Sequence, residues 1–123
     1  MYPSGSWRGF WQQDGWGRQP MAAFRLRFCR SGEVTGGGTD VIGPFTIAGE
    51  CDPRTGEVAL LKMYRGKHTV EYVGRPDGEG CIGGEWVVNE TIAGGTYACR
   101  GPFLLKPDLP PPAGDEPIRE IEF

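Results

Sequence analysis

Apolar and polar residues alternate along short stretches of this chain, and turn residues separate the stretches. The clearest stretch is 21–29, where Phe24, Leu26 and Phe28 alternate with polar or small residues. A period of two is typical of a β-strand with one buried face. Similar short runs recur along the chain, and together they predict eight strands, at residues 7–13, 21–29, 34–40, 45–51, 57–64, 68–74, 81–88 and 94–106.

The connections between these runs are short and rich in turn residues. Asp14-Gly15, Gly43-Pro44 and Asp52-Pro53 are typical of turns, and a longer connection is expected at 89–93. Strands joined in this way form an antiparallel meander, whose edge strands are exposed unless the sheet closes. Eight strands are enough to close a small barrel. The pattern therefore predicts an all-β fold, an eight-stranded antiparallel up-and-down β-barrel with less than one helical turn.

Composition excludes several other classes of protein. Gly accounts for 21 and Pro for 11 of the 123 residues, which argues against a helical bundle. No apolar run approaches the roughly 20 residues of a membrane helix, and no basic-then-apolar leader opens the chain. We therefore expect a soluble, cytoplasmic protein. The four cysteines form no CxxC pair, so a zinc ribbon is not supported, and reduced thiols are expected unless the compartment is oxidising.

Charge divides the chain into two parts. Residues 107–123 hold five acidic residues against Arg119, a net charge of -4, and this segment also contains Pro110-Pro111-Pro112. Residues 1–106 then hold 12 basic and 11 acidic residues, a net charge of +1. We expect a single barrel domain at 1–106 and a flexible Pro-rich acidic tail at 107–123, with 109–123 dispensable for folding. The nearly neutral body gives no general electrostatic reason to expect a nucleic-acid or membrane partner.

Strand direction sorts the inward residues by barrel end. One end collects polar and aromatic groups above Trp11 and Trp86, which is how a small-ligand site is built. The run 57–64 leaves two registers open, with either Leu61 and Met63 or Lys62 and Tyr64 among its inward residues. The candidate ligand-binding residues are Trp11, Asp14, Trp16, Arg18, Asp40, Tyr64, His68, Tyr72 and Trp86.

Several of these features have two interpretations. His68 is an acid or base near neutral pH, or a structural group. The indole of Trp16 acts as a lid or contact, or folds back over the mouth. The outward arginines at 25, 27 and 30 either bind the phosphate groups of a partner or form the solvent-exposed face of a strand. Cys51, Cys81 and Cys99 hold a metal, or are small buried thiols, and we expect neither metal nor cofactor.

Residues along the whole body resemble the avidin and streptavidin family of calycin-like barrels. The resemblance covers about residues 5–106 and rests on short motifs in the same order. These are Gly5-Ser6-Trp7, Gly32-x-Val34-Thr35-Gly36, Ile47-x-Gly49-x-x-Asp52, Tyr72-x-Gly74, Ile82-x-x-x-Trp86 and Phe103-x-x-Lys106. The resemblance implies the eight-stranded barrel already predicted.

The same resemblance argues against biotin as the ligand. In that family, a polar amide follows the first Trp of strand one by two residues, and this position is Gly9 here. A carboxylate precedes the closing Phe by two residues, and this position is Gly101. The polar residues of the third strand correspond to Gly38 and Asp40. A buried urea without its partners loses much of its binding energy, so we expect no useful biotin affinity.

The sequence therefore favours a non-catalytic module that binds a small molecule or a peptide at an aromatic-lined barrel mouth. One alternative is a structural barrel with a filled core that forms a homodimer or homo-oligomer through its wall. Outward charges at Glu71 and Glu85 argue against a large apolar wall. The other alternative is a small barrel enzyme that uses His68 and Asp40, which lacks a placeable nucleophile.

Overall fold

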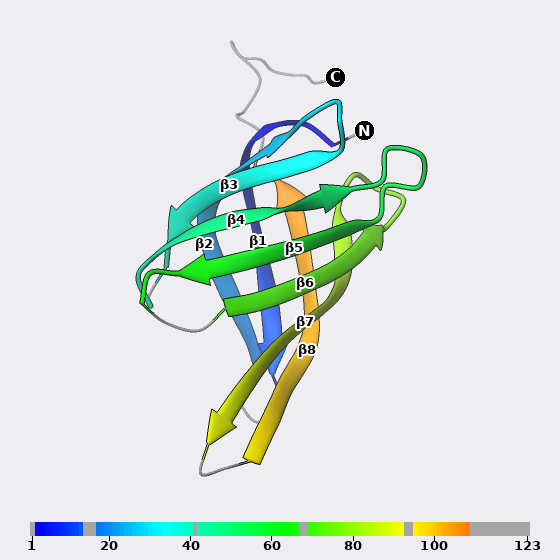
Figure 1. Ribbon diagram of the computed structural model, residues 1–123. Coiled ribbons are helices and arrows are strands. Elements are labelled where there is room, and N and C mark those ends of the chain that lie inside the picture. Colours follow the sequence, from blue (N-terminus) through cyan, green and yellow to red (C-terminus); the bar gives the residue numbers. More distant parts are fainter. Residues whose placement is uncertain (1, 14–16, 41, 67–68, 93–94, 109–123) are drawn as a thin grey trace.

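Eight antiparallel strands form one closed barrel (Figure 1). The structure is a computed structural model that describes residues 2–13, 17–40, 42–66, 69–92 and 95–108, with the backbone alone between 89 and 98. The strands are β1 (Gly5–Gln13), β2 (Gly17–Phe28), β3 (Glu33–Thr39), β4 (Pro44–Cys51), β5 (Val58–Tyr64), β6 (Thr69–Pro76), β7 (Ile82–Ile92) and β8 (Gly95–Pro107). Each strand pairs with the next, and β8 pairs with β1, which confirms the predicted up-and-down barrel. The described residues contain no helix, and so none that could cross a membrane.

Several strands extend further than the sequence pattern predicts, and β1, for example, begins at Gly5 rather than at residue 7. β2 begins at Gly17, β6 continues to Pro76 and β7 continues to Ile92, so the connection expected at 89–93 is wrong over 89–92. The β7–β8 ladder runs to the Ile92–Gly95 pair, and the β1–β2 ladder runs to the Gln13–Gly17 pair. Cross-strand backbone pairing keeps these polar residues extended, and such pairing leaves little trace in local residue preferences.

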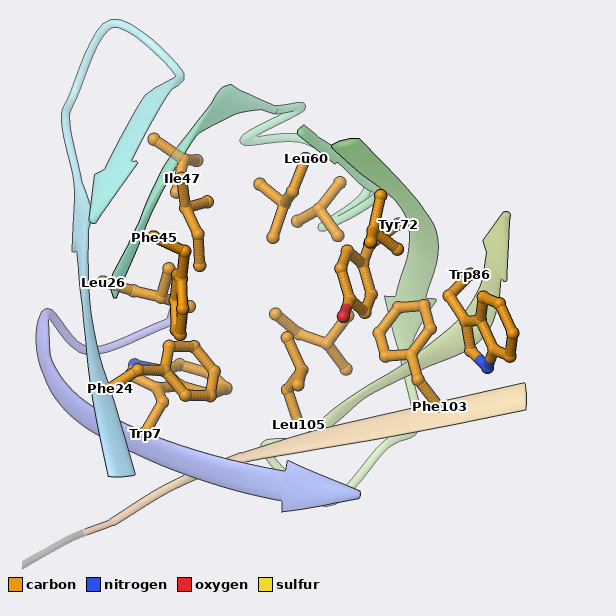
Figure 2. Close-up of a cluster of buried hydrophobic side chains, with 14 of the residues drawn as sticks. Trp7, Phe24, Leu26, Phe45, Ile47, Leu60, Tyr72, Trp86, Phe103 and Leu105 are labelled. Carbon is orange, nitrogen blue, oxygen red and sulfur yellow. The ribbon is translucent and has the colours of Figure 1, made fainter. Parts of the chain in front are cut away.

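Side chains from all eight strands form a buried apolar cluster inside the barrel, and Figure 2 shows many of them. The inward alternation predicted for β2, β4 and β6 is confirmed by buried residues such as Leu26, Ile47 and Tyr72. In β5 the register that the sequence left open is the one that turns Val58, Leu60, Lys62 and Tyr64 inward. Complete burial of one large apolar side chain stabilises the fold by about 1.5–3 kcal/mol, so this ring of residues is the main source of stability.

Glycines allow β1 and β8 to close the barrel. A Cβ added to Gly101 would lie 1.9 Å from the carbonyl oxygen of Gln12, and one added to Gly9 would lie 1.9 Å from that of Leu104. No real side chain tolerates such a distance from backbone. Gly9 and Gly101 are the positions at which the avidin family has polar side chains. In this protein the neighbouring strands approach too closely at both positions for any side chain.

The N-terminal segment covers one end of the barrel. The Tyr2 ring packs against Trp7 and Phe28, with centroids 5.9 and 5.3 Å apart, and its hydroxyl donates to the Gly56 carbonyl at 2.6 Å. The Trp7 indole donates to the Pro3 carbonyl at 2.9 Å. Burial is the main reason why the pKa of Tyr2 rises to about 12. An aromatic plug therefore covers the end at which β1 begins.

Candidate functional site at the barrel mouth

A lysine lies inside the barrel near its other end, which we call the mouth: the end where β3 and β5 finish and β4 and β6 begin. Among the residues whose burial the structure describes, Lys62 is the one charged side chain that is buried, at 3% relative exposure. Its Nζ lies 4.3 Å from the ring centroid of Phe45 and 5.0 Å from that of Tyr64. Both rings are placed to stabilise an ammonium through cation–π attraction.

Asp40 supplies the counter-charge, from the turn directly after β3. Its Oδ2 accepts hydrogen bonds from the Lys62 ammonium at 2.9 Å and from the Tyr64 hydroxyl. Its Oδ1 accepts from the backbone N–H groups of Ile42 at 2.9 Å and Gly43 at 3.3 Å. Backbone bonds in both directions between Asp40 and Gly43 close the same turn. The turn therefore holds the carboxylate over the mouth in the way an Asx-turn orients its side chain.

The three groups shift one another's pKa values. Burial is the main reason why the pKa of Lys62 is lowered, although the Asp40 carboxylate partly opposes this. Burial alone would raise the pKa of Asp40, but the bonds from Tyr64 and Lys62 outweigh it and lower that pKa. Burial and the bond to Asp40 raise the pKa of Tyr64. The pKa shifts of Asp40 and Tyr64 favour a carboxylate beside a neutral phenol, and the carboxylate opposes loss of the proton from Lys62.

Aromatic rings surround this polar cluster. Phe45 meets Tyr64 edge to face at 5.8 Å, and Phe24 meets Phe45 in the same way at 6.3 Å. Deeper in the barrel, Tyr72 packs edge to face on Phe103 at 5.0 Å (Figure 2). Burial is also the main reason why the pKa of Tyr72 is raised. The mouth therefore combines a few polar atoms with a mostly aromatic surround.

Trp11 and Trp86 form a second aromatic contact, with centroids 5.7 Å apart. The Trp86 indole Nε1 donates to the Gln12 carbonyl at 3.0 Å. It reaches that carbonyl across Gly101, which pairs with Trp86 in the ladder of β7 and β8. This bond ties β7 to β1 over the intervening strand, so Trp86 has a role in barrel closure as well as in lining the interior.

The structure brings together some of the residues named from the sequence. Asp40 and Tyr64 are in direct contact, and Trp11 contacts Trp86. Arg18 lies apart, because its guanidinium covers the Phe10 ring at 4.0 Å on the outer surface. Tyr72 lies deeper, against Phe103. Asp14, Trp16 and His68 lie outside the described residues.

Lys62 was not among the named candidates, although it is the centre of the site. The available signal was its position in the alternation Val58-x-Leu60-x-Lys62-x-Tyr64, where an apolar residue would be expected. A charged residue at an inward position is informative because buried lysines are rare unless paired. The second register of β5 hid this signal, because it would have turned Lys62 outward.

Cys29, Cys51 and Cys81 lie at the plugged end, at or beside the ends of β2 and β4 and the start of β7, whereas Cys99 lies on β8 opposite Val88. Cys51 is buried near the plugged end, and burial is the main reason why its pKa is raised. None of the four cysteines, all of which the structure describes, forms a disulfide. Within the described residues there is also no group of three metal-ligating side chains.

Comparison with known proteins adds no further information on the site. No protein-family model matches the chain, and neither a curated protein nor a solved structure matches it.

Proposed function

We propose that this protein is a non-catalytic binding module that holds a small molecule or a peptide segment at the mouth formed by Asp40, Lys62 and Tyr64. The observation that carries the proposal is the Lys62 ammonium, which is paired with Asp40 at 2.9 Å inside an otherwise apolar barrel. Burying an ion pair costs free energy of solvation, and well-packed apolar residues would often give equal or greater stability. A role in ligand binding would explain why the sequence retains the Lys62–Asp40 ion pair despite this cost.

The shape of the barrel supports the same proposal. Tyr2 covers the plugged end, so the mouth is the end at which polar atoms approach solvent. The side chain of Asp40 is 20% exposed and that of Lys62 is 4% exposed, so a ligand would meet the carboxylate first. We therefore expect a ligand whose hydrogen-bond donor displaces the long 3.3 Å bond from the Gly43 N–H to Asp40, and whose apolar or aromatic surface meets Phe45 and Tyr64.

The contacts of Asp40 favour binding over catalysis. Both of its oxygens already accept hydrogen bonds, from Lys62 and Tyr64 on one side and from the Ile42–Gly43 backbone on the other. A lowered pKa also makes it a weak base. The alternative in which Asp40 works with His68 as an acid–base pair has less support for these reasons.

The resemblance to the avidin and streptavidin family is part of the proposal at the level of architecture. The quoted motifs and the closed eight-stranded barrel support it. Reduced thiols at four cysteines without disulfides are compatible with a cytoplasmic protein, which remains our expectation.

A ligand screen with two matched variants tests the proposal. The wild type, Asp40→Asn and a control, Arg65→Gln at the exposed turn after β5, are heated with a panel of small amines, amides and short peptides. A compound at about 100 times its dissociation constant stabilises the fold by about 2.7 kcal/mol. We expect a binder to raise the melting temperature of the wild type and of the control, and to lose this effect with Asp40→Asn.

The structural alternative makes the opposite prediction at Val70. Val70 pairs with Lys62 in the β5–β6 ladder, so the two residues lie at the same depth along the barrel, and both are buried. In a barrel with room for a ligand, Val70→Phe would abolish ligand binding with little loss of stability. In a filled core, the larger ring would destabilise the fold by about 1–3 kcal/mol. The second result, combined with an empty screen, would favour the filled-core barrel.

A further inference from the structure

Charged side chains on the outer surface are segregated by strand. β8, β1 and β2 lie side by side in the closed barrel (Figure 1) and contain six basic residues and no acidic residue. All six are exposed: Arg8, Arg18, Arg25, Arg27, Arg100 and Lys106. Exposed acidic residues lie on the other strands, namely Glu33, Glu50, Glu71 and Glu85, where Arg75 on β6 is the exposed basic residue among the residues whose burial the structure describes. We call the outward faces of β8, β1 and β2 the basic wall.

Most of this positive charge is not neutralised within the protein. Arg8 pairs with Asp108 at 3.1 Å, and Arg100 approaches Glu85 at 3.8 Å. The other four cations, Arg18, Arg25, Arg27 and Lys106, form no ion pair with any residue that the structure describes. The small net charge of residues 1–106 therefore conceals a strongly basic surface, whose field acts on any anion that approaches this side.

The basic wall also carries an apolar hollow. Its floor is formed by Phe10 on β1, Pro20 and Met21 on β2, and Leu104 on β8, and its rim includes Arg8, Arg18 and Lys106. The Arg18 guanidinium lies 4.0 Å from the Phe10 ring centroid. An unpaired base can stack on the Phe10 ring once it displaces the Arg18 guanidinium from that face, while the surrounding cations contact phosphates.

We propose that the basic wall binds the phosphate backbone of single-stranded nucleic acid. Five of its six cations are arginines, whose planar guanidinium groups match phosphate oxygens in a bidentate way. Phe10 is useful only to a base that is not already stacked in a duplex, which favours a single strand. The surface is the outside of a barrel, and the part of the chain that the structure describes offers no helix that could enter a major groove. This site is separate from the mouth, because the residues of the basic wall face outward.

Fluorescence anisotropy with a labelled oligothymidylate and the full chain tests the proposal. Four uncompensated cations predict a slope of about -2.8 for log affinity against log salt concentration, at roughly -0.7 for each phosphate contact. Binding should therefore weaken about fifty-fold between about 50 and 200 mM salt. Phe10→Ala should lower the affinity by at least about five-fold without changing that slope.

A pair of charge-reversal variants separates a local surface from an effect of net charge. Arg25→Glu with Arg27→Glu should reduce affinity at least about ten-fold and halve the slope, because two contacts are lost. The control is Arg65→Glu with Arg75→Glu, which makes the same change of charge at exposed positions after β5 and on β6. It should retain nearly full affinity. Circular dichroism and melting temperatures establish that each variant is folded.

Three results would overturn the proposal. The first is no salt-dependent binding of the oligonucleotide at low salt. The second is an equal loss of affinity in both charge-reversal variants, which would mean that net charge alone is at work. The third is a preference for polyglutamate or for a duplex of the same length, which would assign the basic wall to an acidic protein or to groove binding.

Discussion

Lys62 and Asp40 form an ion pair whose two members are buried to different degrees. Their polar atoms are 2.9 Å apart, but the lysine side chain is 4% exposed and the aspartate side chain 20%. Asp40 also has other partners, since Tyr64 and two backbone N–H groups bind its oxygens. Lys62 has only Asp40 and two aromatic rings within the described residues. The lysine therefore depends on the aspartate more than the aspartate depends on the lysine.

This inequality predicts unequal effects of removing each partner. Asp40→Ala leaves a buried ammonium without its counter-charge and should destabilise the fold by about 3 kcal/mol. Lys62→Met removes the buried charge and keeps most of the volume, so its stability should lie within about 1 kcal/mol of the wild type or above it. Urea unfolding of both variants measures the two values. Equal destabilisation by the two substitutions would contradict this inequality, and a stable Asp40→Ala variant would mean that other groups solvate Lys62.

Acid should weaken the contribution of this pair. The pKa of Asp40 is lowered in the folded protein below its usual value of 3.8. A carboxyl with a lowered folded pKa stabilises the fold at all pH values above its unfolded pKa and loses that stabilisation as the pH falls through the folded value. The stability difference between the wild type and Asp40→Asn should be constant above about pH 5 and shrink below about pH 4. Urea unfolding at a series of pH values checks this, and a difference that stays constant down to about pH 2 would contradict it.

Two adjacent glycines in β7 should respond differently to the same substitution. A Cβ on Gly84 would lie 2.0 Å from the Val73 carbonyl oxygen, whereas one on Gly83 would meet nothing closer than 3.6 Å. Gly84→Ala should therefore force β6 and β7 apart and destabilise the fold by several kcal/mol, roughly as overpacking does. Gly83→Ala should be neutral, or stabilising by about 0.4–1 kcal/mol, because alanine restricts the unfolded chain. Thermal unfolding of both variants measures the contrast, and similar melting temperatures would disprove it.

The sequence predicts the barrel well because its signals are local. Alternation such as Phe24-x-Leu26-x-Phe28 and turn residues such as Asp52-Pro53 each report on a few neighbouring residues, and eight such runs suffice for a closed meander. The extent of β7 was missed because residues 89–92 are held by pairing with β8, and that pairing is not local. For the same reason, the sequence alone shows Gly9 and Gly101 only as positions without a polar side chain for a ligand. Their role in strand approach depends on Leu104 and Gln12, from neighbouring strands.

The site was only partly predictable. Asp40 and Tyr64 were named because strand direction sends both to one end of the barrel, and they are in contact there. The sequence leaves the orientation of Lys62 open, because the register of β5 depends on its ladders with β4 and β6, which one strand alone does not reveal. The plug at the other end was not anticipated, because Tyr2 precedes the first strand and binds Gly56 through a single long-range hydrogen bond.

Biotin tests whether the resemblance to the avidin family extends to its ligand. Losing each buried hydrogen-bond partner costs about 1–3 kcal/mol, and this chain lacks side-chain partners at Gly9 and Gly101. We expect a dissociation constant in the micromolar range or weaker, which corresponds to about -8 kcal/mol or less favourable binding. Calorimetric titration of the purified protein measures it.

The structure also predicts that the missing contact cannot be restored by substitution. In Gly9→Asn the new Cβ would lie 1.9 Å from the Leu104 carbonyl oxygen, which is far too close. Strands β1 and β8 would therefore have to separate before the new amide could meet a ligand. We expect Gly9→Asn to melt well below the wild type and to bind biotin no better, because the free energy lost in the seam exceeds the roughly 1–3 kcal/mol that one buried hydrogen bond returns. Melting temperatures and calorimetry on the same preparation measure both quantities. A stable Gly9→Asn variant with improved affinity, or nanomolar binding by the wild type, would mean that β1 and β8 lie further apart than described here and that the interior accepts the ureido ring.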